Sequence, residues 1–252
     1  NTMKDITLEV CCGGAGDAVT AARCGASRVE LNSSLLSGGL TPSAGEFLLA
    51  REKTDIPIIC MVRPRAGGFC YSPFEFDAML RDAAFFMEHG AAGIAFGILT
   101  EDGRVDKPRC RRLMAEVGQG ESVFHRAFDA AAGDPLEMAE KLAELGVTRL
   151  LSSGRAADAL TGAPLLRQVA ERFAGRVQLL PGGGVRESNA AEIVRLTGCT
   201  QLHFSCHRTV FDRSGSGNSL LSFDGAAPPA PAAVQELDGN ALRARIAAIR
   251  GR

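Results

Sequence analysis

"ITLEVC", residues 6–11, alternates apolar and polar side chains, which is the pattern of a β-strand with one buried face. Its apolar residues share one face, and Glu9 and Cys11 share the other. The next stretch of this kind, "RVELN" (28–32), places Glu30 on the corresponding face. In a closed sheet, one face of each strand packs on helices and the other lines the interior. The two stretches therefore predict strands that carry acidic side chains inside a barrel.

Eight such stretches alternate with helical patterns along the chain. Strands are predicted at residues 6–11, 28–32, 57–64, 93–99, 122–128, 149–153, 177–182 and 201–206. Several helices between them begin with capping residues, and "SPFE" (72–75) has the residue order of a capping box. This alternation predicts right-handed βαβ units, a parallel sheet and closure into a (β/α)8 TIM barrel. A doubly wound open sheet is the alternative, although such sheets usually stop at about five or six strands.

The chain length of 252 residues fits one domain of this kind. Barrel motifs cover residues 5–210. Residues 211–237 are rich in Gly, Ser, Pro and Ala, and we expect a long loop there. Residues 238–250 predict a last helix.

Composition limits the classes of partner. The formal net charge of −1 at pH 7 argues against nucleic acid or an anionic membrane surface. No apolar run reaches the length of a membrane span. Eight cysteines are scattered through the sequence, and its first residues lack the pattern of a signal peptide. We therefore expect reduced thiols and a cytoplasmic location.

The stretch "FHRAFD" (124–129) places three ionisable side chains in a short, aromatic, strand-like segment. Strand alternation puts its histidine inside the barrel, near the C-terminal end of the strand. The same rule predicts an inward-facing ring of ionisable residues: Glu9, Glu30, Arg63, His125 and His203. Active sites of TIM barrels form at this end. The alternative interpretation is a structural polar plug, in which the two glutamates pair with the arginine.

Two loops at the same end have the composition of an anion site. "LPGGGV" (180–185) follows the seventh strand, and Gly182, Gly183 and Gly184 allow backbone N–H groups to approach a ligand. "SSG" (152–154) ends the sixth strand and offers donors from Ser153 and Gly154. The alternative interpretation of the glycines is a tight turn without a ligand, but their position after the seventh strand favours the anion site.

A set of longer motifs, in this order and spacing, resembles the copper homeostasis protein CutC family: "LEVCC", "RVELNSSLLSGGLTPS", "MVRPRAGGFCYS", "FGILTEDGRVD", "FHRAFD", "LLSSG", "LPGGGV" and "LHFS". The resemblance extends from about residue 8 to about residue 206. It implies a (β/α)8 barrel, a cytosolic location, a homo-oligomer (a dimer or a tetramer) and copper binding.

The copper hypothesis concerns Cu(I), which prefers thiolate ligands. The resemblance points to Cys11, and the neighbouring Cys12 is the second candidate, although strand alternation sends the two to opposite faces. The family pattern commonly has "ELCS" in the second strand, whereas this sequence has "ELNS", with Asn32 at the cysteine position.

The alternative function is an enzyme acting on a small anionic or phosphorylated metabolite. In that hypothesis Arg63 and the glycine loop hold the anion, and His125 exchanges protons together with an inward-facing glutamate. Asp129 or His203 orients His125. The same carboxylates and histidines also suit a divalent ion such as Zn or Mn. In either hypothesis the partner is a small ligand or a metal ion, and the absence of a dinucleotide fingerprint argues against a nicotinamide cofactor.

Overall fold

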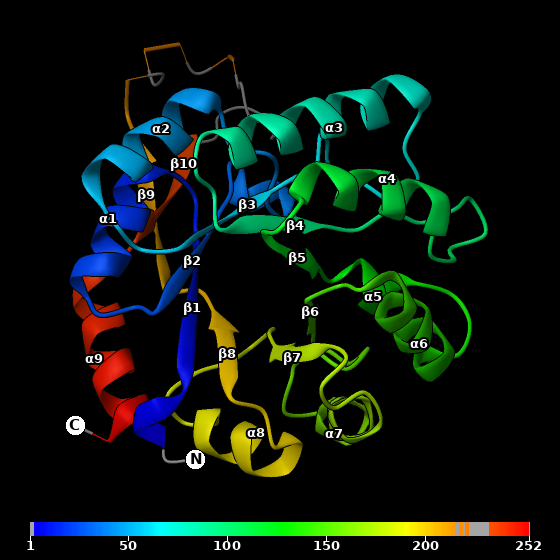
Figure 1. Ribbon diagram of the computed structural model, residues 1–252. Coiled ribbons are helices and arrows are strands. Elements are labelled where there is room, and N and C mark those ends of the chain that lie inside the picture. Colours follow the sequence, from blue (N-terminus) through cyan, green and yellow to red (C-terminus); the bar gives the residue numbers. More distant parts are fainter. Residues whose placement is uncertain (1–2, 215–216, 219, 222–231, 252) are drawn as a thin grey trace.

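The computed structural model describes residues 3–214, 217–218, 220–221 and 232–251 (Figure 1). Eight parallel strands within this part of the chain form one sheet: β1 (Thr7–Cys12), β2 (Arg28–Leu31), β3 (Ile58–Met61), β4 (Gly93–Phe96), β5 (Glu121–Phe124), β6 (Arg149–Ser152), β7 (Gln178–Pro181) and β8 (Gln201–Phe204). Their hydrogen-bonded order is β7-β6-β5-β4-β3-β2-β1-β8. A bridge between Gly182 and His203 joins the two ends of the sheet. The predicted (β/α)8 barrel is therefore confirmed.

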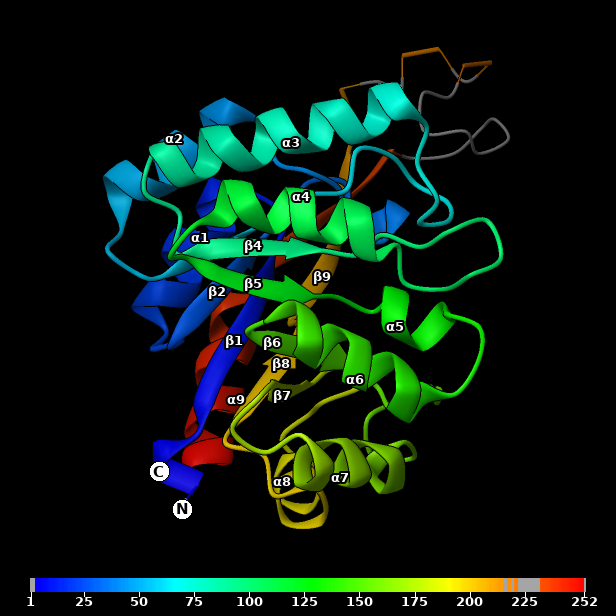
Figure 2. The same cartoon turned by 45° about the vertical axis from the view of Figure 1, so that its right-hand side comes forward.

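Helices alternate with these strands and surround the sheet (Figure 2). They are α1 (Ala15–Arg23), α2 (Ala44–Lys53), α3 (Pro73–Glu88), α4 (Lys107–Val117), α5 (Ala127–Ala130), α6 (Pro135–Leu145), α7 (Ala163–Arg172), α8 (Ala190–Thr197) and α9 (Gly239–Arg250). Short 3-10 turns lie at Met3–Asp5 and Leu35–Ser37. None of the helices among the described residues combines the length and the apolar character needed to cross a lipid bilayer.

Capping residues begin several helices where the sequence predicts them. The hydroxyl of Ser72 accepts a hydrogen bond from the backbone N–H of Glu75, and the Glu75 carboxylate accepts one from the backbone N–H of Ser72. This is the predicted capping box of α3. Asp106 and Asp134 cap α4 and α6 through their carboxylates. These bonds satisfy backbone donors that a first helical turn leaves unpaired, so the helix starts are well defined.

The core has an outer and an inner layer. The outer layer lies between strands and helices and contains alternate strand residues such as Leu8, Val10 and Cys60. The inner layer fills the barrel itself and consists of Ile59, Met61, Ala95, Val123, Leu151 and Leu180. These apolar side chains fill the middle of the barrel. Most of the polar residues predicted to face inward therefore lie beyond this layer, at the C-terminal ends of the strands.

The fifth strand is shorter than predicted. It ends at Phe124, and Ala127–Ala130 form a single helical turn where the prediction continued the strand to residue 128. Arg126 and Asp129 form an ion pair of 2.8 Å across this turn, at a spacing that brings side chains together on a helix. His125 therefore lies where the strand gives way to its loop.

The segment predicted as a loop at residues 211–237 includes parts of two strands. β9 (His207–Asp212) and β10 (Ala232–Leu237) pair along their full length as an antiparallel ribbon. Backbone hydrogen bonds between β9 and β10 therefore form strands at both ends of this segment, although its composition is typical of a loop. The rest of the predicted loop falls largely at residues 215–216, 219 and 222–231, which lie outside the described residues. The predicted last helix is confirmed as α9, with Asp238 as its cap.

Candidate metal centre at the barrel mouth

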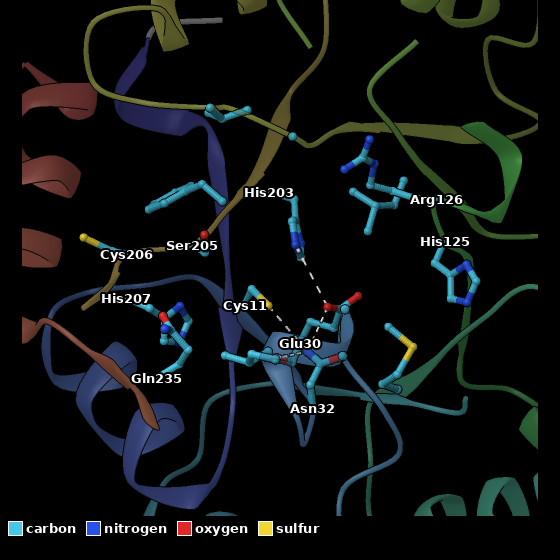
Figure 3. A pocket seen from close by; sticks show the side chains of 18 of the residues that line it. Cys11, Glu30, Asn32, His125, Arg126, His203, Ser205, Cys206, His207 and Gln235 are labelled. Atoms are coloured by element: carbon cyan, nitrogen blue, oxygen red, sulfur yellow. Dashed lines mark hydrogen bonds and ion pairs between the residues drawn. The ribbon is translucent and has the colours of Figure 1, made fainter. Parts of the chain in front are cut away.

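A cavity of about 1050 Å³ opens at the C-terminal ends of the barrel strands (Figure 3). It is lined by polar residues from several strands and the loops that follow them, among them Cys11, Glu30, Asn32, Arg63, His125, Arg126 and His203. The ribbon β9–β10 and helix α9 contribute residues to its rim, including His207, Gln235 and Arg245. Most of the predicted inward-facing ring therefore reaches one cavity, as expected for this fold.

Three of these side chains offer potential metal ligands that lie within 4.8 Å of one another: Cys11, Glu30 and His203. They come from β1, β2 and β8, which are neighbours in the sheet. Strand register explains the cluster, because Cys11 is paired with Glu30 and Glu9 is paired with His203. All four residues have the inward parity of their strands. We call Cys11, Glu30 and His203 the metal triad.

The imidazole of His203 is held in place by Glu9. Its Nδ1 lies 2.7 Å from Oε1 of Glu9, and its Nε2 lies 4.0 Å from Oε2 of Glu30. Glu9 also accepts a hydrogen bond from Nε of Arg28, whose Nη2 donates to Gln201 at 2.9 Å. Carboxylates that bind the outer nitrogen of a histidine commonly fix the ring for metal ligation through the other nitrogen. Glu9 is thus placed to orient a ligand and not to bind the metal itself.

The charges of this network are tightly linked. Burial alone raises the pKa of Glu9, but the hydrogen bond and charge of His203 and the charge of Arg28 lower it to about 2. Burial likewise lowers the pKa of His203, but the charge of Glu30 and the hydrogen bond to Glu9 hold it well above its ordinary value. Burial also raises the pKa of Glu30. Without a metal ion, a protonated His203 is therefore the cation of this cluster.

Asn32 bridges two members of the metal triad. Its Nδ2 donates to Oε2 of Glu30 at 3.0 Å and lies 3.5 Å from Sγ of Cys11. Oε1 of Glu30 and Oδ1 of Asn32 are both buried without a hydrogen-bond partner among the described residues. Buried acceptors of this kind are uncommon and call for a donor or a cation. Burial raises the pKa of the Cys11 thiol, so a metal ion must displace its proton to bind there.

Cys12, the other predicted ligand, packs away from the cavity. It is fully buried in the outer core, and its thiol lies 3.6 Å from the carbonyl oxygen of Val10. The structure therefore gives Cys12 no place in the metal triad. The cause is the strand alternation that separates it from Cys11.

Arg63 does not form the polar plug considered from the sequence. Its guanidinium donates to the backbone carbonyls of Ser37, Gly39 and Gly67 at 2.8–3.1 Å. No ion pair joins it to Glu9 or to any other carboxylate in the described part of the chain. The partners of Arg63 could not be predicted from the sequence, because every residue has a backbone carbonyl and no side chain identifies these three.

His125 lies on the cavity wall but outside the metal triad. Its Nδ1 accepts a hydrogen bond of 3.0 Å from the backbone N–H of Ala127, and its Nε2 is buried without a partner among the described residues. Burial and the charge of Arg63 lower the pKa of His125 to about 3, so the ring is neutral. The expectation that Asp129 or His203 orients it is wrong, since both carry their hydrogen bonds elsewhere.

Asp129 occupies the donors predicted to bind an anion at the sixth strand. Its carboxylate accepts from the hydroxyl of Ser152 and from the backbone N–H and hydroxyl of Ser153. The backbone N–H of Gly154 donates to Ser152 at 2.8 Å. These donors are therefore used within the protein. In the glycine loop, the backbone N–H of Gly182 is also used, by the carbonyl of Ser152. Gly183 and Gly184 line the cavity.

Arg28 and Arg126 are site residues that were not predicted from the sequence. Arg28 shares the inward parity of Glu30 on β2, so the alternation of "RVELN" already contained a signal for it. Arg126 reaches the cavity because β5 ends at Phe124, two residues before it. Nothing in the sequence clearly indicated that the strand would end there.

The fold and the triad define a (β/α)8 barrel with a candidate metal centre at the C-terminal ends of its strands. The sequence model of the CutC family matches residues 6–208. The chain belongs to the CutC family.

Curated relatives and a solved structure agree with this membership. A CutC family protein of Treponema denticola is 44% identical over 227 residues, which cover 90% of this chain and 92% of the relative. The copper homeostasis protein cutC homolog of Homo sapiens is 42% identical over 202 residues, covering 80% and 74%. The crystal structure of a CutC protein from Streptococcus agalactiae superposes with a TM-score of 0.74 at 30% identity, covering 79% of this chain and 98% of that one. An aldolase, QR15, has a TM-score of 0.60 at 13% identity and shows only the shared fold.

Proposed function

We propose that this protein takes part in copper homeostasis by binding a copper ion at the metal triad. The observation that carries the proposal is the convergence of Cys11, Glu30 and His203 within 4.8 Å at the mouth of the barrel. Family membership supports the copper assignment, because relatives in Homo sapiens and Mus musculus are named copper homeostasis proteins.

The donor set fits a copper ion. A thiolate and an imidazole are ligands that copper accepts readily, and Cys11 and His203 supply them. Glu30 adds a carboxylate with one buried oxygen that lacks a partner within the described chain. Glu9 keeps its hold on Nδ1 of His203, which leaves Nε2 for the metal. Binding displaces protons from Cys11 and His203.

The carboxylate also makes the triad acceptable to a divalent ion such as Zn²⁺, which commonly takes three protein ligands of these types. The second thiolate position of the family pattern is Asn32 here, so the site is less soft than a pair of cysteines. The choice between Cu(I) and a divalent ion is therefore part of the test.

The experiment is an anaerobic Cu(I) titration of the reduced protein against a competing chelator, with a parallel Zn²⁺ titration. Wild type is compared with Cys11→Ser and His203→Ala. Cys70→Ser is the matched control, because Cys70 is an exposed thiol that does not line the cavity. We expect stoichiometric Cu(I) binding that the two triad variants lose and that Cys70→Ser retains.

Equal Cu(I) affinity in wild type and Cys11→Ser would contradict the proposal. Stoichiometric Zn²⁺ binding without competitive Cu(I) binding would instead assign the triad to a divalent ion. Binding lost equally in all three variants would point to general damage, which circular dichroism detects independently.

We also propose a cytoplasmic location and a homo-oligomeric state, with a metal ion or small ligand as partner and no role for nucleic acid or membrane. All eight cysteines are free, as expected in a reducing compartment. The near-neutral formal charge of −1 supports the absence of a polyanionic partner. Cell fractionation tests the location, and light scattering coupled to gel filtration tests the oligomeric state.

A further inference from the structure

The cavity has a second polar side outside the metal triad. It is formed by residues that follow β3, β5 and β7: Arg63, His125, Arg126, Gly183 and Gly184. In Figure 3, Arg126 and His125 lie across the opening from Cys11. We call these five residues the cationic side. Copper binding at the triad uses none of them.

Arg63 is a buried cation without a counter-ion. The residue is 8% exposed, its terminal nitrogens donate to three backbone carbonyls, and its guanidinium carbon lies 5.3 Å from the centroid of the Phe69 ring. No carboxylate of the described residues lies within ion-pair distance of it, and its Nε is buried without a hydrogen-bond partner there. A buried charge is costly unless an opposite charge compensates it. Since Arg63 lines the cavity, a bound anion is the available source of that compensation.

Arg126 is fixed in position beside the glycine loop. Its Nε donates to Asp129 at 2.8 Å and its Nη2 donates to the hydroxyl of Ser153 at 3.0 Å. The remaining nitrogen, Nη1, would lie 3.4 Å from a Cβ atom placed on Gly183. The guanidinium is therefore held with its third nitrogen toward the space that the missing side chain leaves open.

The glycine loop offers a backbone donor to the same space. Gly183 and Gly184 have φ angles of +104° and +67°, which L-residues with side chains rarely adopt. The backbone N–H of Gly184 donates no hydrogen bond within the described part of the chain, whereas the N–H of Gly183 faces the carbonyl of His203 in the bridge that joins the ends of the sheet. A free backbone N–H next to a guanidinium is a suitable pair of donors for an oxyanion.

The balance of charge in the cavity favours an anion as well. Among its described lining residues, four arginines face two carboxylates: Arg63, Arg126, Arg186 and Arg245 against Glu30 and Asp238. Arg126 pairs with Asp129 and Arg245 pairs with Glu187, both outside the lining. Arg63 and Arg186 have no ion pair in this part of the chain, which leaves an excess of positive charge at the cavity.

We propose that the cationic side binds the oxyanion group, phosphate or carboxylate, of a small metabolite, with Arg63, Arg126 and the backbone N–H of Gly184 as its donors. The cavity volume of about 1050 Å³ is far larger than a metal ion requires and accommodates such a molecule. The site does not depend on the metal triad for any of its donors.

The test is isothermal titration calorimetry of the intact protein after treatment with a chelator. Inorganic phosphate, glycerol 3-phosphate and succinate are titrated separately, with glycerol as the uncharged control. We expect saturable binding of at least one oxyanion and none of glycerol. Arg126→Gln should weaken that binding about tenfold or more, as loss of a charge-assisted hydrogen bond implies. Arg167→Gln is the matched control, because Arg167 pairs with Glu171 on the surface of α7 and does not line the cavity.

The results also identify the chemical class of the ligand. Binding of the two phosphate compounds without succinate assigns a phosphate group, and the reverse assigns a carboxylate. The proposal is overturned if no oxyanion binds at millimolar concentration, or if Arg126→Gln binds as tightly as Arg167→Gln. Because the metal is removed beforehand, these outcomes are independent of whether copper binds at the triad.

Discussion

Nδ1 of His203 lies 2.7 Å from Oε1 of Glu9, and this contact decides which nitrogen of the ring is available to a ligand. Glu9 is 1% exposed and is itself paired with Arg28. The arginine thus fixes the carboxylate, and the carboxylate fixes the imidazole. Nε2 then faces the side on which Glu30 lies. A metal site built in this way depends on residues that never touch the metal.

The first prediction concerns that positioning role. Glu9→Gln should weaken metal binding about 10- to 100-fold, because an amide holds the imidazole less firmly and no longer favours the required tautomer. Affinity is measured by chelator competition. Glu171→Gln, at an exposed carboxylate, is the control and should leave affinity unchanged. An unaltered affinity in Glu9→Gln would assign Glu9 to stability alone, which thermal unfolding of the variant measures separately.

The second prediction is a pH dependence of metal affinity. The pKa of His203 is held well above its ordinary value, and burial raises that of Cys11. Both groups carry protons in the metal-free protein at neutral pH, and both protons must leave when the metal binds. Affinity should therefore rise with pH from about 6 to about 8, and binding should release protons. Calorimetry in two buffers of different ionisation enthalpy counts these protons. A pH-independent affinity would show that His203 is not a ligand.

The same raised pKa predicts the pH dependence of folding stability. A group whose pKa is higher in the folded state stabilises that state fully below its unfolded pKa, and the contribution is lost as pH rises through the folded value. The difference in unfolding free energy between wild type and His203→Gln should therefore be largest below about pH 6.5 and should shrink at alkaline pH. Urea unfolding at several pH values measures it. A difference that grows with pH would contradict a protonated His203.

The sequence predicted the barrel well because strand parity and helix caps are local signals. Alternation in "ITLEVC" placed Glu9 and Cys11 inside, and the Ser72 capping box was visible in four residues. The pairing of Cys11 with Glu30 was not visible, because it depends on the register between two strands. Register is set by contacts distant in sequence, which no single strand reveals.

The errors of prediction have a common physical cause. Asp129 was expected to orient His125, but the early end of β5 turns its carboxylate toward Ser152 and Ser153. The sequence "FHRAFD" has the composition of a strand, and the helical turn at its end is held by hydrogen bonds that Asp129 accepts from the end of β6 and the loop that follows it. Tertiary contacts of this kind override local preference. The same contacts use the donors of Ser153 and Gly154, which were predicted to bind an anion.

The fourth prediction concerns Asn32, whose Nδ2 lies 3.5 Å from the sulfur of Cys11. Asn32→Cys places a second thiolate beside the first and makes the site softer. Cu(I) affinity should increase about tenfold or more, which corresponds to about 1.4 kcal/mol of added ligand energy, while Zn²⁺ affinity should change less. Parallel chelator competition with both ions measures the ratio. Asn32→Ser, a change of similar size without a thiolate, is the control and should show no gain.

The last prediction concerns Gly97, which lies behind His125 in the loop after β4. A Cβ atom at this position would overlap the His125 ring and the Cβ of Ala127. Gly97→Ala should therefore lower the free energy of unfolding by about 2 kcal/mol and displace His125, as overpacking does in a filled interior. Gly16 in α1 is the matched control, because a Cβ there meets nothing within 4 Å. Gly16 lies in the first turn of α1, and Gly16→Ala should stabilise the protein by about 0.5 kcal/mol, since alanine leaves the unfolded chain less freedom than glycine does. Urea unfolding measures the free energy of unfolding of both variants. Equal values would contradict the prediction and would show that His125 and Ala127 can move to accommodate a methyl group at position 97.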